Sequence, residues 1–203
     1  MAHTAALGFR IKSGWAVAVL VEGTAASPRV VDRHIVELSD PHVPAARQPY
    51  HASTGVSREP DSPELHHLIA GIESFAQHSL LSLMNRVAPP DRRLRGAGIV
   101  VGSDIDPARI GNPHVRAHAS EGRLFRSVVA NTLVERSLPC TIFVERDLPS
   151  TASRVLGHSD AALKRLLTEL GRPLAGSWRR DDKMATLAAW LVLSSAGTAG
   201  HRH

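Results

Sequence analysis

The chain has 203 residues, 43% of them hydrophobic and 21% charged, which is enough for one globular domain with a substantial core. Its formal net charge of +5 is compatible with nucleic-acid binding but does not demand it, because the basic residues form no long run. A single cysteine, Cys140, excludes a disulfide framework and a cysteine-based zinc site; we expect a small buried residue in a strand.

The N-terminal residues have no signal-peptide pattern, and the longest apolar run, Met184 to Leu193, is too short to span a bilayer. We therefore expect a cytoplasmic protein without a membrane partner. The tail 200–203 is expected to be disordered. The sequence does not decide the oligomeric state, and a homodimer is compatible with it.

Three strand-like segments open the chain, at 7–11, 15–21 and 29–38. Short segments rich in Gly and Ser separate them, which favours hairpin connections. The second segment is apolar without alternation, as in a strand buried on both faces, whereas the third alternates partly and is expected near an edge. The range 39–62, rich in Pro, His, Ser and Arg, is predicted to be a long surface loop.

Helices and strands then alternate. In chain order, the predicted elements are a helix from Pro63 to before Pro89, a strand at 94–102, a helix from Pro113 to near Ser137, a strand at 141–145, and helices opening at Pro149, after Ser159 and at Asp182. This order predicts an α/β fold with a mixed sheet, in which three antiparallel strands precede parallel ones and helices cover both faces. No linker or repeat interrupts it, so we expect a single domain over 1–203.

Four segments resemble the RuvC and YqgF nucleases of the ribonuclease H-like superfamily, and they occur in that family's order. They are the first hairpin at 7–18, the strand Ile99-Val100-Val101-Gly102, the segment Phe143 to Ala152, and the helix opening Asp182-Lys183-Met184-Ala185. The resemblance implies a ribonuclease H-like domain that acts on or binds structured RNA or branched DNA. If the protein is an enzyme, the resemblance implies phosphodiester hydrolysis with Mg²⁺ or Mn²⁺.

The first strand departs from that family at its metal-bridging aspartate. Aligning Gly8 with the family's glycine puts Arg10 at or next to that position, and no Asp or Glu lies between Met1 and Val21. Two-metal cleavage needs carboxylates that hold cations about 4 Å apart, whereas an arginine repels Mg²⁺ and binds phosphate. The resemblance therefore implies the fold without carrying over the activity, unless Glu22 or Asp32 supplies the missing acid.

The matched positions leave Glu145 and Asp182 as candidate catalytic residues and metal ligands, although acids such as Asp182 also stabilise a helix's first turn. Asp104, after the fourth strand, and Glu121 are two further catalytic candidates. The candidate contacts to nucleic acid are Arg10, Arg116, Arg123, Arg146 and Lys183.

The segment 112–126 is unusual in composition. If it is helical, His114, His118 and Glu121 lie on one face, a spacing that can hold a metal or transfer protons; a solvated face with incidental histidines is the more ordinary explanation. Three functions therefore stay open. They are a divergent nuclease, a catalytically degenerate module that binds nucleic acid or protein, and a small-molecule or metal-dependent activity at His114–Glu121.

Overall fold

A computed structural model describes residues 3–56 and 62–195; the predicted tail 200–203 lies outside the described residues. Its centre is a five-stranded sheet in the order β3-β2-β1-β4-β5. The strands are β1 (His3–Lys12), β2 (Trp15–Gly23), β3 (Pro28–Glu37), β4 (Arg92–Val101) and β5 (Cys140–Val144). The first three are antiparallel neighbours, whereas β4 runs parallel to β1 and β5 parallel to β4. The predicted mixed sheet is confirmed, with β3 at an edge.

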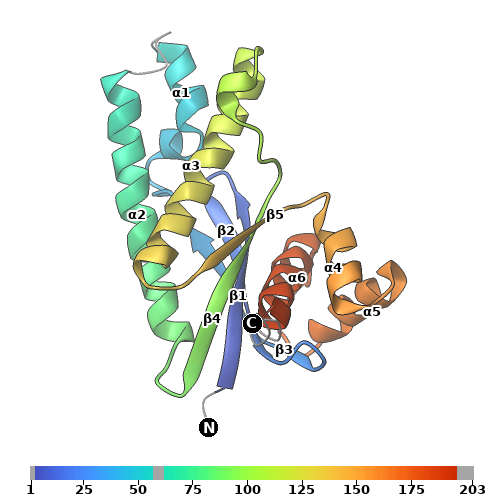
Figure 1. The fold of residues 1–203 in the computed structure, drawn as a ribbon. Coiled ribbons are helices and arrows are strands. Elements are labelled where there is room, and N and C mark those ends of the chain that lie inside the picture. The colour runs from blue at the N-terminus through green and yellow to red at the C-terminus, as the bar shows by residue number, and fades with distance from the viewer. Residues whose placement is uncertain (1–2, 57–61, 196–203) are drawn as a thin grey trace, which may run out of the picture.

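Helices cover both faces of this sheet (Figure 1). One layer holds α1 (Pro49–Val56), α2 (Pro63–Val87) and α3 (Pro113–Glu135), and the other holds α4 (Leu148–Leu156), α5 (Asp160–Leu170) and α6 (Arg180–Ser194). Two short 3₁₀ helices, η1 (Pro44–Arg47) and η2 (Pro107–Arg109), lie in the connections. Within residues 3–56 and 62–195, no helix is long and apolar enough to cross a membrane.

Polar side chains begin three of these helices, as the sequence predicts. The Ser62 hydroxyl accepts a hydrogen bond from the Leu65 amide, and Asn112 and Ser159 cap α3 and α5 in the same way. A proline follows Ser62 and Asn112 directly, where its missing N–H costs no intrahelical bond.

The structure corrects the prediction of a long surface loop over 39–62. This segment contains η1 and α1, each of which begins with a proline, and Tyr50 packs against the main core. Its polar composition concealed these helices, because no periodic apolar stripe marks them in the sequence. Residues 57–61 lie outside the described part of the chain.

Helix α6 lies unusually close to the centre of the sheet. A Cβ atom built on Gly8 would lie 1.8 Å from the carbonyl oxygen of Ala185, and one on Gly98 would lie 2.6 Å from that of Ala188. Glycine on β1 and β4 and alanine on α6 therefore permit a contact that larger side chains would prevent. This contact brings the first turn of α6 to the carboxyl end of β1.

Candidate nucleic-acid interface

Arg10 lies near the carboxyl end of β1, on the sheet face that α6 covers. Side chains alternate along a strand, so Arg10 points to the same face as Gly8, which touches α6. Only 6% of Arg10 is exposed. A nearly buried guanidinium requires anionic or carbonyl partners close by.

Those partners come from three parts of the chain. Arg10 forms an ion pair with Glu145, which directly follows β5, and its Nη1 donates to the carbonyl oxygen of Ile11 at 2.6 Å. Its Nε is 3.7 Å from Oδ1 of Asp181, in the first turn of α6, and that oxygen is 3.1 Å from Nζ of Lys12. The other oxygen of Glu145 lies 3.0 Å from Nη2 of Arg180. Acids and bases therefore alternate at this edge of the sheet.

Asp182, the predicted partner of Glu145, makes different contacts. Its Oδ2 accepts from the backbone N–H of Arg179 at 2.6 Å, and its Oδ1 is 3.4 Å from Nη1 of Arg33 on β3. The side chain is 3% exposed. Among these residues, Asp181 is the acid that shares Arg10 with Glu145, while Asp182 caps α6 and ties it to β3.

The other candidate acids lie in separate ion pairs. Asp104 pairs with Arg126 of α3, and Glu121 faces His51 of α1, with 2.8 Å between its Oε1 and the imidazole Nδ1. Glu22 lies opposite Ala5, towards the amino end of β1, where Arg29 and Arg92 bind it. Asp32 of β3 pairs with His34.

This arrangement does not fit a pair of Mg²⁺ ions. Such ions require several carboxylates around an open space, and their oxygens must be free to bind metal. Here both oxygens of Glu145 contact guanidinium groups, and Asp181 contacts Arg10 and Lys12. Arg10 provides the positive charge that a metal would otherwise supply.

A groove of about 390 Å³ opens beside Arg10. The carboxyl ends of β1 and β4 line one part of it, including Lys12 and Ser103, and the amino-terminal half of α3 lines another, including His118. Cationic side chains at this edge of the sheet reach solvent: Lys12 is 35% and Arg180 78% exposed. Arg146, which directly follows Glu145, is 83% exposed and lies 3.5 Å from Asp147. The carboxyl edge of parallel strands is where open α/β sheets commonly bind ligands.

The remaining predicted cations have local partners. Arg116 donates to the carbonyl oxygen of Ile110 at 2.8 Å, and Arg123 lies 3.2 Å from Asp106, so both hold the loop before α3. Lys183 donates to the hydroxyl of Thr168 at 3.1 Å.

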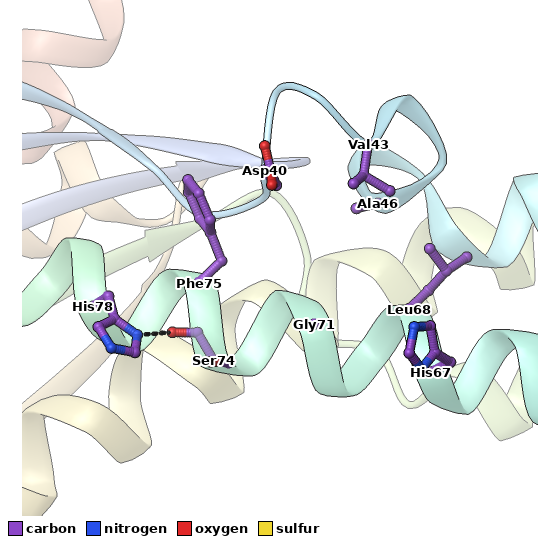
Figure 2. Close-up of a pocket in the computed structure, with 9 residues that line it drawn as sticks. All are labelled: Asp40, Val43, Ala46, His67, Leu68, Gly71, Ser74, Phe75 and His78. Carbon is purple, nitrogen blue, oxygen red and sulfur yellow. Dashed lines mark hydrogen bonds between the residues drawn. The ribbon is translucent and has the colours of Figure 1, made fainter.

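A second cavity, of about 360 Å³, lies between the segment 40–46 and α2 (Figure 2). Its lining includes Val43, Leu68 and Phe75, together with His78, whose Nδ1 is 2.8 Å from the carbonyl oxygen of Ser74. Asp40 is the one carboxylate among the described residues that line it, and none of these is Lys or Arg. The groove beside Arg10 is therefore the better match for a polyanion.

Three histidines form a cluster near the amino end of α3. His51 of α1 joins His114 and His118, with ring centroids 4.1 to 4.8 Å apart. The buried carboxylate of Glu121 lies against His51 and, at 3.7 Å, His118. The helical spacing predicts only three of these four residues; His51 lies 63 positions before His114, and no periodicity connects the two segments.

The protein has a ribonuclease H-like α/β fold, as comparison with solved structures shows. Thermus thermophilus RuvC in complex with a Holliday junction substrate superposes with a TM-score of 0.57 at 13% identity, covering 97% of each chain. A second structure of Thermus thermophilus RuvC gives a TM-score of 0.54 at 15% identity, covering 96% of this chain and 97% of that one. No protein-family model and no curated protein matches the sequence. The similarity to RuvC is thus one of structure, at low sequence identity.

Proposed function

We propose that this protein is a ribonuclease H-like module that binds structured or branched nucleic acid without cleaving it. The observation that carries the proposal is the position of Arg10 between Glu145 and Asp181. A side chain in that position neutralises the two acids from within the protein, so their oxygens contact protein cations instead of a pair of metal ions.

Phosphate binding is assigned to the cations around this ion pair. Arg10 itself is nearly buried, whereas Arg146 and Arg180 pair with Asp147 and Glu145 but are mostly exposed at the same edge. Exposed guanidinium groups bind phosphate oxygens strongly, and the neutralised acids beneath them no longer repel a polyanion. The RuvC structure that contains a Holliday junction supports branched DNA as the first ligand to test.

The test measures binding and cleavage on the same substrates. Fluorescence anisotropy with a labelled four-way DNA junction, a linear duplex and a structured RNA is recorded in EDTA over a series of salt concentrations. We expect binding that weakens linearly on a log–log salt plot, and an unchanged substrate after incubation with Mg²⁺ or Mn²⁺.

A charge-matched pair of variants locates the interface. Arg146→Ala/Arg180→Ala removes two exposed cations beside Glu145, and should lower the magnitude of the salt slope by about 2, or about one per phosphate contact. Arg93→Ala/Arg95→Ala removes the same charge from exposed positions near the amino end of β4, and should leave the slope unchanged. Equal losses in both variants would point to unspecific attraction.

Two results would reject the proposal. Absence of binding to all three substrates at low salt would remove nucleic acid as the ligand and leave a protein partner. Metal-dependent cleavage that Glu145→Gln abolishes would identify an active nuclease with the same fold.

A further inference from the structure

We propose that His51, His114 and His118 bind one zinc ion, with Glu121 orienting the imidazole of His51. The ligating nitrogens of these histidines lie within 4.8 Å of one another. Nε2 of His114 and Nε2 of His118 are 3.2 Å apart. Two nitrogens at about 2.0–2.1 Å from a tetrahedral zinc ion are separated by about 3.3 Å, so this pair already has the spacing of a bound state.

Glu121 makes this cluster different from three incidental surface histidines. Its side chain is 0% exposed, and a buried carboxylate is costly unless cationic or N–H groups surround it. Oε1 lies 2.8 Å from Nδ1 of His51, and Oε2 lies 3.7 Å from Nδ1 of His118. A carboxylate can only accept, so the contact with Glu121 places the proton of His51 on Nδ1 and leaves the lone pair of Nε2 as the metal donor.

The choice of metal follows from the donor atoms. Three neutral imidazoles suit zinc and its neighbours among the transition metals, whereas Mg²⁺ and Ca²⁺ require oxygen ligands. Three protein ligands leave one position of a tetrahedral ion for water or another small ligand.

The site connects two helices and borders the groove. His51 belongs to α1, and His114 and His118 belong to the first turns of α3, so one ion would fasten α1 to α3. His118 also lines the groove beside Arg10 and Lys12. A bound dication would add positive charge to that wall of the groove.

The test uses the full-length protein, freed of metal with a chelator and titrated with Zn²⁺ by calorimetry. We expect one tight site per chain. His114→Ala/His118→Ala should weaken it at least about 100-fold, and Glu121→Gln, which keeps all three imidazoles, about 10- to 100-fold. The matched control is His66→Ala/His67→Ala, which removes two exposed histidines from α2 and should bind as the unmodified protein does.

Circular dichroism identifies any variant that fails to fold. Cobalt(II) added to the unmodified protein supplies a second reading, because a four-coordinate site gives an intense visible spectrum. Equal binding by the two double variants, or a six-coordinate cobalt spectrum, would overturn the zinc site. These measurements need no nucleic acid, so their outcome is independent of the proposed binding function.

Discussion

Arg10 and Glu145 are 135 positions apart in the chain and form an ion pair in which 7% and 17% of their side chains are exposed. The pair joins β1 to the end of β5 at the edge of the sheet where α6 begins. Breaking a pair of this burial leaves a charge without its partner in a poorly solvated place, which costs more than the pair itself contributes.

Glu145→Gln should therefore lower the free energy of unfolding by about 3 kcal/mol, measured by urea denaturation. Asp147→Asn is the matched control, because Asp147 and its partner Arg146 are 61% and 83% exposed, and its effect should stay within about 0.5 kcal/mol. If the two variants lowered the free energy of unfolding equally, the Arg10–Glu145 pair would contribute no more to stability than an exposed ion pair.

Arg10→Asp should convert the site into a cation site. The variant places a third carboxylate beside Glu145 and Asp181, and mutual repulsion should lower its melting temperature in EDTA. Mg²⁺ should restore part of that loss by binding the folded state, while the unmodified protein shows no Mg²⁺-dependent shift. Differential scanning fluorimetry with and without Mg²⁺ tests this. A melting temperature of the variant that does not change with Mg²⁺ would contradict the prediction.

Gly8→Ala should destabilise the fold by about 1–3 kcal/mol, because the new methyl group meets the backbone of α6 at Ala185 and the helix must move. Gly71→Ala is the control: Gly71 lies inside α2 with open space around its Cβ position, and the substitution should stabilise by up to about 1 kcal/mol. Thermal unfolding of the two variants should therefore shift in opposite directions.

Burial raises the pKa of the Cys140 thiol from its ordinary value of 9.0 to about 11. The folded state therefore favours the neutral thiol, so this contribution to stability is fully present below pH 9 and disappears as the pH rises towards 11. Alkylation at pH 8 should be slow in the folded protein and accelerate in urea, and the single cysteine makes the mass change unambiguous. Equally fast labelling in both states would contradict this.

The sequence by itself predicts most of the fold, because the signals involved are local. Pro63 and Pro113 follow capping residues, β2 reads as a continuous apolar run, and Asp182-Lys183 leads into an apolar helix; each pattern acts within one element. Local signals do not predict the helices within 39–62. Ala46 of η1 and Tyr50 of α1 pack against the core, and this packing, more than any periodic pattern, stabilises the two helices.

The sequence also determined that β1 carries an arginine and no acid. Only the tertiary structure decided what that arginine does, which is to pair with Glu145 and approach Asp181, while Asp182 turns to Arg33. The same holds for His51, which reaches His114 and His118 only because α1 packs beside α3. Side chains far apart in the chain are brought together by helix and strand packing, and that packing depends on long-range contacts that no short pattern encodes.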